Sequence, residues 1–301
     1  MIMDCTAVMV ILNYNDGRVT RKLTDTVKDY ECLDRVIVVD NCSTDDSYEY
    51  LHTAFRKSEV DVIKTPANDG YAVGNNFGIR YAINHYNPKY IFVANPDIAV
   101  GESTIRNMIH LMYDNPEYGV LAPIVNQGYN VWNLPGFIGM IESLFLVWFN
   151  LDKKKIKDKL LKSTENIEPV GVVEGSFFLI RTEDYVSIDG LDERTFLYAE
   201  EIILAKRLEK IGKKIGVLPC ERYDHLHSAS IKKAYKSSKR KAFPNFYRSF
   251  CIYNKYYLNT NAFQNGIFSV CYGLAYFERF IYDVVMRGKA VVTTFRSNKT
   301  K

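Results

Sequence analysis

The chain has 301 residues, of which 47% are hydrophobic and 25% are charged, an ordinary globular composition with enough apolar material for a core. The formal net charge is +4, and the basic tracts at residues 152–159 and 232–241 lack the aromatic interleaving of a single-strand binder, so we expect no nucleic-acid partner. No run reaches about 18 uninterrupted apolar residues, which excludes an evident membrane-spanning helix.

The first 125 residues alternate between apolar runs and helical stretches. Buried strands are predicted at residues 7–12, 35–40, 60–64 and 90–94, and a helix at 103–113. This order predicts a mostly parallel α/β sheet flanked by helices. Right-handed crossovers bring the carboxyl ends of such strands to one edge, where ligands bind.

Polar clusters follow three of these strands, at residues 13–15, 40–44 and 95–97, and we expect them to converge at that edge. The glycines at 70, 74 and 78 share one helical face, and close packing on the sheet is favoured over a ligand role. The dinucleotide fingerprint and the phosphate loop are both absent, so dehydrogenases and P-loop enzymes lose their main support.

Residues 136–149 are almost wholly apolar and are followed by the first basic tract. Two interpretations stay open: an in-plane membrane anchor, or a buried helix with a solvated lysine tail. Further on, residues 175–181 predict a strand, 196–211 predict a helix ended by Gly212, and 266–285 predict an amphipathic helix.

Several residues could take part in chemistry. Asp97 follows a buried strand and could hold Mg²⁺ or Mn²⁺, or cap the next helix. Asp40 could accept a hydrogen bond from a pyrimidine or a ribose hydroxyl, or simply form a turn. Glu200 and Glu201 open a helix, as the helix dipole favours, yet one of them could serve as a general base. His225 could bind a metal or phosphate.

Six segments, taken together and in order, resemble the family 2 glycosyltransferases with the GT-A fold, especially the rhamnosyltransferase-like branch. The segments are VILNYN at 10–15, VVDNCSTD at 38–45, NDGYAVGNNFGI at 68–79, NPDI at 95–98, GSFFLIR at 175–181 and GLDERTFLYAEE at 190–201. The resemblance covers about residues 7 to 230 and implies a Rossmann-like, mostly parallel sheet.

For the donor side, the resemblance implies that Asn13 and Asp40 line the nucleotide pocket and that Asn76 lies in the donor site. Asp97 corresponds to the second acid of the family's D-x-D motif and would bind the metal, with His225 near the metal and the diphosphate.

For the acceptor side, Glu201 matches the catalytic base, with Glu200 beside it. The implied mechanism is a single displacement with inversion, in which the metal stabilises the leaving diphosphate. The sequence departs from the family at three positions: Asn95 replaces the first acid of D-x-D, the base is Glu rather than Asp, and Ile203 stands where another acid is frequent.

The expected organisation is a GT-A domain at residues 1–232, divided into a nucleotide-sugar half (1–125), an apolar and basic insert (126–169) and an acceptor or catalytic half (170–232). Residues 233–301 form an aromatic, basic, helical C-terminal region. Six cysteines without a C-x-x-C pair fit a reducing compartment. Residues 1–4 lack the features of a signal peptide. We therefore expect a cytoplasmic protein, peripheral at the inner face of the cell membrane if the apolar insert is an anchor.

The expected donor is dTDP-rhamnose or a UDP-hexose, and the acceptor a glycan, lipid-linked if the chain meets a membrane, as in surface polysaccharide synthesis. Two other functions stay open. A nucleotidyltransferase would more often carry a glycine-rich, basic loop after the first strand, where this chain has Asn13-Tyr14-Asn15. A non-catalytic sugar-nucleotide-binding protein would fit the Asn95 and Ile203 departures.

Overall fold

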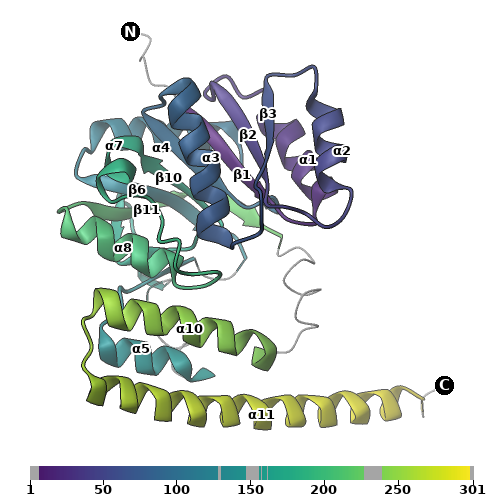
Figure 1. Cartoon of the computed structure of the whole chain (residues 1–301), viewed down its shortest axis with the longest axis vertical. Coiled ribbons are helices and arrows are strands. Elements are labelled where there is room, and N and C mark those ends of the chain that lie inside the picture. The colour runs from purple at the N-terminus through teal and green to yellow at the C-terminus, as the bar shows by residue number, and fades with distance from the viewer. Residues whose placement is uncertain are drawn as a thin grey trace.

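The computed structural model describes residues 7–127, 130–146, 156, 158–160, 162–226 and 239–298, with side chains up to residue 284 and without those of 239–241. A nine-stranded sheet lies above a layer of three helices (Figure 1). The strands are β1 (Ala7–Asn13), β2 (Arg35–Asp40), β3 (Val60–Lys64), β4 (Tyr90–Ala94), β5 (Ile98–Ala99), β6 (Tyr118–Val125), β7 (Val131–Trp132), β8 (Glu168–Val170), β9 (Val172–Val173), β10 (Phe177–Arg181) and β11 (Lys214–His225). The helices are α1 (Gly17–Val27), α2 (Ser47–Phe55), α3 (Tyr71–Tyr86), α4 (Glu102–Asp114), α5 (Phe137–Leu144), α7 (Thr182–Ser187), α8 (Glu200–Lys210), α10 (Lys239–Tyr257) and α11 (Ala262–Asn298).

The predicted mostly parallel sheet is confirmed. Its strand order is β3-β2-β1-β4-β10-β6-β11-β5, with β8 beside β11. The strands β3, β2, β1 and β4 run parallel, and β6 runs parallel to β11. Strand β10 runs antiparallel between β4 and β6, and the short strands β5 and β8 also pair in the antiparallel sense.

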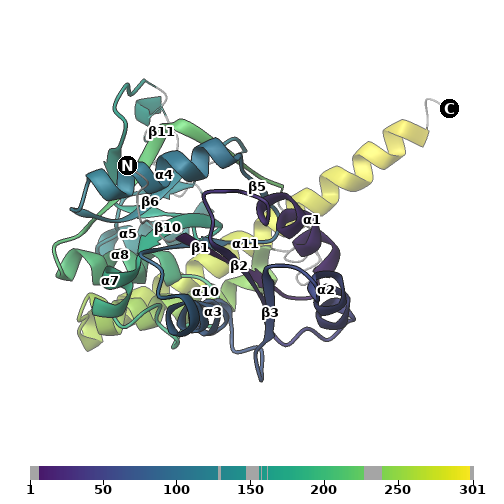
Figure 2. The same cartoon turned by 90° about the horizontal axis from the view of Figure 1, so that it is seen from above.

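The two faces of the sheet bury different residues because side chains alternate along each strand. Val8 and Val10 of β1 point to the face covered by α3 and α8, whereas Met9 and Ile11 point to the face covered by α1, α2 and α4. Since helices cover both faces, the strands are apolar runs rather than alternating ones. Figure 2 shows these helices on either side of the sheet.

Close packing of α3 on the sheet is confirmed for two of the three glycines. A Cβ on Gly74 would lie 2.6 Å from a Leu12 methyl, and one on Gly78 would lie 2.5 Å from a Val39 methyl. Gly70 lies before the helix, with φ 105, and a Cβ there would meet the Phe196 carbonyl at 2.2 Å. Glycine is therefore required at position 70 both by backbone conformation and by the close approach of another segment.

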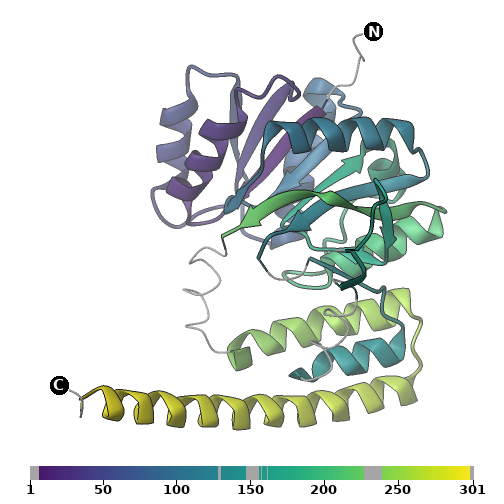
Figure 3. The same ribbon diagram turned by 180° about the vertical axis from the view of Figure 1, so that it is seen from behind.

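The helical layer combines α5 from the middle of the chain with α10 and α11 from its end (Figures 1 and 3). Arg279 of α11 donates to the Leu144 carbonyl at 2.6 Å, and Glu278 accepts from the Leu146 N–H at 3.1 Å. Met140 and Leu144 of α5 are fully buried. The buried-helix interpretation therefore accounts for residues 137–144, whereas residues 147–149 and most of the first basic tract lie outside the described residues. The domain boundaries stay a prediction.

Two helices differ in length from their predictions. The helix predicted at 196–211 begins at Glu200 instead, because Tyr198 and Ala199 have φ of 74 and 70, outside the helical region. The helix predicted at 266–285 extends over 262–298. Among the described residues, none of the helices combines the length and the apolar character needed to cross a bilayer.

Candidate active site

The ends of β1 and β2 form a buried polar network. Asn13 and Asp40 are in register, and the Asn13 amide donates to Asp40 at 2.8 Å and to the Ser43 hydroxyl at 3.1 Å. The second Asp40 oxygen accepts the Ser43 N–H at 2.9 Å, and Thr20 donates to Asn13 at 2.7 Å. Asn13 and Asp40 are both 0% exposed. They fix the course of the loop after β2, and their role in a nucleotide pocket stays a prediction.

A second group of site residues is assembled by the smallest strand of the sheet. Strand β5 pairs with the end of β11, so that Ile98 faces His225 and Ala99 faces Asp224. The Leu226 N–H donates to the Asp97 carbonyl at 2.9 Å, and the His225 N–H donates to the Gln127 side chain at 3.0 Å. This ladder brings Asp97 and His225 together, and their role as a shared metal site, which the family resemblance implies, stays a prediction.

The His225 ring lies between two acids. Its Nε2 is 3.3 Å from Asp97 Oδ1, and its Nδ1 is 3.8 Å from Glu174 Oε1. Burial alone would lower the pKa of His225, but the hydrogen bond and charge of Asp97, with the charge of Glu174, raise that pKa above its usual value of 6.5. Asp97 and His225 are both buried, at 8% and 7% exposed.

The Asp97–His225 pair fits two ligands of one divalent ion. Ligand atoms about 2.1 Å from a small cation such as Mg²⁺, set at right angles, lie about 3 Å apart, close to the 3.3 Å found here. Over the described ranges no cluster of three or more His, Cys, Asp or Glu side chains could hold a metal.

The predicted base, Glu201, contacts the residue that follows Glu174 in the chain. Glu201 Oε1 accepts the Gly175 N–H at 3.2 Å, and the Tyr71 hydroxyl donates to the Gly175 carbonyl. A Cβ on Gly175 would lie 3.0 Å from the Tyr71 hydroxyl oxygen and 3.2 Å from Glu201 Oε1. Residues 174–175 thus join the Asp97–His225 pair to Glu201, because Glu174 contacts His225 and Gly175 contacts Glu201.

Glu200 is in a different environment from Glu201. It is 4% exposed, and its Oε1 has no hydrogen-bond partner among the described residues. Burial, and then the negative charge of Glu201, raise the pKa of Glu200 well above its usual value of 4.5. Because Glu200 is buried, it is disfavoured as the residue that meets the acceptor. Glu201 is only partly buried.

The raised pKa of Glu200 predicts a pH-dependent stability. Because the folded protein holds this proton more tightly than the unfolded chain, the group's stabilising contribution is complete below about pH 4.5 and is lost as the pH rises through the folded pKa. Glu200→Gln should therefore raise Tm at pH 8 relative to wild type, with little change at pH 4. A change of 1 kcal/mol in the free energy of unfolding corresponds to a shift of about 2–4 °C in Tm. Thermal unfolding at both pH values measures this.

The control for Glu200→Gln is Glu209→Gln, the same change on the same helix at a side chain that is 57% exposed, which should leave Tm unchanged at both pH values. A Glu200→Gln protein destabilised equally at pH 4 and pH 8 would contradict the raised pKa.

Asn76 makes four hydrogen bonds within the protein. Its amide donates to the Leu191 carbonyl and to Glu193, both at 2.9 Å, and its oxygen accepts from the Tyr185 hydroxyl at 2.7 Å and the Leu191 N–H at 3.0 Å. These bonds hold α3 against the loop before α8. The donor-site role of Asn76 stays a prediction.

Glu174 was missed by the sequence analysis, although it precedes the predicted strand at 175–181 and is the nearest acid to it. Tyr71 was missed as well, and the charges of Glu201, Glu200 and Glu174, after burial, raise its pKa. The signal that could have identified Glu174 is an isolated acid within the apolar sequence VVEGSFFLI.

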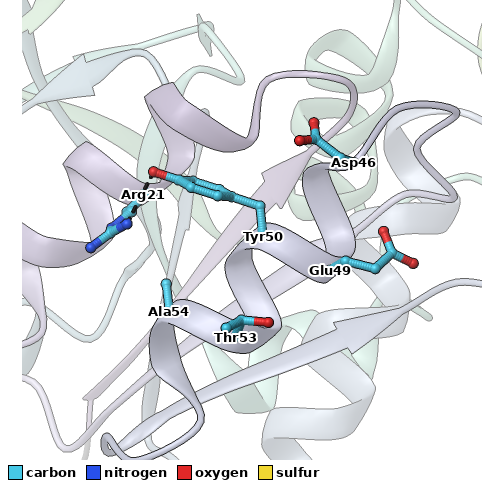
Figure 4. Close-up of a pocket in the computed structure, with 6 residues that line it drawn as sticks. All are labelled: Arg21, Asp46, Glu49, Tyr50, Thr53 and Ala54. Atoms are coloured by element: carbon cyan, nitrogen blue, oxygen red, sulfur yellow. Dashed lines mark hydrogen bonds between the residues drawn. The ribbon is translucent and has the colours of Figure 1, made fainter.

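A surface pocket of about 380 Å³ lies between α1 and α2, lined by Arg21, Asp46, Glu49, Tyr50, Thr53 and Ala54 (Figure 4). Arg21 donates to the Tyr50 hydroxyl across it at 3.1 Å. None of the residues discussed above lines this pocket, so it is not part of the candidate site.

Known proteins resemble this chain in both sequence and fold. A low-salt glycan biosynthesis hexosyltransferase of Haloferax volcanii is 25% identical over 249 residues, which are 82% of this chain and 75% of that protein. An N-acetylglucosaminyl-diphospho-decaprenol L-rhamnosyltransferase of Mycobacterium tuberculosis is 29% identical over 192 residues. That match covers 59% of this chain and 61% of the relative, so the chain spans less than two thirds of it.

A mannosyltransferase of Pyrobaculum calidifontis, solved in complex with GDP-Man and Mn²⁺, superposes with a TM-score of 0.56 over 98% of this chain and 80% of its own, at 13% identity. This likeness supports the GT-A fold. The family model for glycosyl transferase family 2 matches residues 8–184, a stretch that includes Asn13, Asp40, Asn76 and Asp97. With more than half of its length matched by that model, the chain belongs to glycosyl transferase family 2 and is a glycosyltransferase with the GT-A fold.

Proposed function

We propose that the enzyme is a metal-dependent, inverting glycosyltransferase that moves a sugar from a nucleoside diphosphate to an acceptor hydroxyl. The observation that carries this proposal is the Asp97–His225 pair, 3.3 Å apart, beside the segment 174–175 that also contacts Glu201. A metal-ligand pair next to a partly exposed carboxylate supplies the two groups that such a transfer needs.

Asp97 and His225 would hold Mg²⁺ or Mn²⁺, which when bound neutralises charge on the leaving diphosphate. The mannosyltransferase with a similar fold was solved with Mn²⁺. Glu174, on the other side of the imidazole from Asp97, would keep the His225 ring oriented toward the metal.

Glu201 would act as the general base. Its carboxylate is held in position by the Gly175 N–H and would accept the proton of the acceptor hydroxyl. The acceptor oxygen would attack the anomeric carbon from the side opposite the diphosphate, so that the configuration inverts. Tyr71 supports this arrangement because its hydroxyl fastens the Gly175 carbonyl.

For the donor we propose dTDP-rhamnose or a UDP-hexose, in line with the rhamnosyltransferase and hexosyltransferase relatives. Asn13, Asp40 and Asn76 would shape the donor side within residues 1–125, and residues 170–232 would form the acceptor side. The acceptor would be a lipid-linked glycan of surface polysaccharide synthesis, since the mycobacterial relative is named for a diphospho-decaprenol substrate. The enzyme would then work at the inner face of the cell membrane.

A donor screen tests this function. Purified protein is incubated with UDP-, GDP- and dTDP-sugars and Mn²⁺ or Mg²⁺, and released nucleoside diphosphate is measured together with thermal shifts. Metal-dependent release from one donor would support the proposal and identify the sugar. Thermal shifts without release, even after lipid-linked acceptors are added, would favour a non-catalytic binder. The absence of both would contradict the nucleotide-sugar donor.

A further inference from the structure

The outward face of α11 is apolar in a way that is unusual for a surface helix. Exposed hydrophobic side chains recur along it at intervals of three and four residues, so they share one face. They are Ile267, Val270, Leu274, Phe277, Ile281 and Val284, which are between 37% and 66% exposed. Over these residues the stripe is about 25 Å long. Tyr276 and Phe280 are also exposed beside it.

Over residues 262–284 of the same helix, where side chains are described, the charged residues face the protein. Between residues 262 and 284 the only charged side chains are Glu278, Arg279 and Asp283. Arg279 is buried and donates to the Leu144 and Ala275 carbonyls, and Glu278 accepts from the Leu146 N–H. Asp283 is partly buried. The outward face thus carries apolar side chains where a surface helix usually carries charges, which marks the stripe as a contact surface.

The stretches of sequence that follow α5, precede α10 and end α11 are mostly basic. From residue 285 to the last residue the basic residues are Arg287, Lys289, Arg296, Lys299 and Lys301, and no acidic residue occurs. The chain enters α10 through residues 227–241, which are also basic without an acid, and α5 is followed by the lysine-rich tract at 152–159. A partner with negative charge would match these segments.

A second copy of this chain is a poor occupant for the stripe. If the stripe residues were positions a and d of a coiled coil, positions e and g would be Gly266, Cys271, Gly273, Glu278 and Phe280. Paired helices usually carry charges at these positions, and here the only charge, Glu278, accepts from the Leu146 N–H just after α5. An apolar face without charged flanks suits a lipid surface better than a helical seam.

We propose that the outward face of α11 lies in the plane of an anionic bilayer, with the stripe residues in the headgroup and acyl boundary. Figures 1 and 3 show α11 as the outermost element of the helical layer, on the side away from the sheet. This position lets the helix meet a membrane along its length without displacing α5 or α10. The proposal does not depend on the identity of the donor or of the acceptor.

Flotation of the full chain with vesicles tests the proposal. Wild type should float with vesicles of 30% phosphatidylglycerol in phosphatidylcholine, and less with phosphatidylcholine alone or at high salt. The double variant Leu274→Glu/Phe277→Glu should reduce the bound fraction by about tenfold or more. It removes two apolar side chains that the membrane would otherwise bury. The control Val186→Glu changes an equally exposed side chain, 60% exposed on α7, and should float like wild type.

A second measurement guards against misfolding of the double variant. Val270→Trp should give a blue-shifted emission, quenched by brominated lipids, when anionic vesicles are added. Equal flotation of wild type and the double variant, or no flotation of wild type, would overturn the proposal. So would a dimer in lipid-free light scattering that the double variant converts to a monomer, because the stripe would then be an interface between copies. Equal binding to neutral vesicles would overturn the anionic preference.

Discussion

Glu201→Gln is expected to lower kcat by about 10² to 10⁴-fold, the usual contribution of a general base. The amide oxygen can still accept the Gly175 N–H, so the local structure should be kept, but the side chain can no longer take the acceptor's proton. KM for the donor and the metal concentration for half-maximal rate should change little. Steady-state kinetics with the donor identified by screening measures all three.

The matched control for this variant is Glu209→Gln, the same chemical change on α8 at an exposed position, which should leave kcat unchanged. A Glu201→Gln enzyme with kcat within about threefold of wild type would rule out Glu201 as the base and turn attention to Glu200. A fall in thermal stability together with kcat would instead indicate a structural role.

Asp97→Asn is expected to lower kcat by about 10² to 10³-fold, comparable to the loss of one strong electrostatic contact to a developing anion. The substitution keeps the size of the side chain but removes the negative charge that binds a divalent cation. Higher Mn²⁺ concentrations should restore part of the rate, because affinity for the ion is what is lost. Calorimetric titration of Mn²⁺ in the presence of a nucleoside diphosphate measures this affinity directly.

Asp25→Asn serves as the control for Asp97→Asn, since Asp25 is an exposed residue of α1 whose ion pairs are with Arg21 and Lys28. It should bind Mn²⁺ as wild type does. Unchanged Mn²⁺ affinity in Asp97→Asn would contradict the assignment of Asp97 as a ligand, whatever happened to the rate.

The parallel part of the sheet could be predicted because its strands are buried on both faces. The apolar runs of β1, β2 and β4 are too long and too apolar to be surface segments in a chain of this composition. The direction of β10 could not be predicted, since a run such as Phe177–Arg181 looks the same in a parallel and an antiparallel ladder. Strands β6 and β11 were not predicted, although Tyr118–Val125 is buried throughout.

The candidate site was predicted less completely than the fold. The grouping of Asn13 with Asp40, and of Asp97 with His225, follows from strand ends that meet at one edge and from the family resemblance. The hydrogen bonds that bury Asn13 and Asp40 depend on where the Ser43 loop turns, which local sequence does not determine. The start of α8 was misjudged because the left-handed conformations of Tyr198 and Ala199 are imposed by tertiary contacts, such as the Tyr71 N–H bond to the Phe196 carbonyl.

The pairing of β5 with β11 has a consequence for folding. It joins Ile98 to His225, two residues that lie more than a hundred positions apart in the chain. Pairings of such high contact order close late, because the entropy of a long loop is lost before the contact stabilises it. During synthesis the Asp97–His225 pair cannot exist until β11 has left the ribosome. If Asp97 and His225 hold a metal as proposed, the capacity to bind it should be gained late in refolding, after the parallel strands have formed.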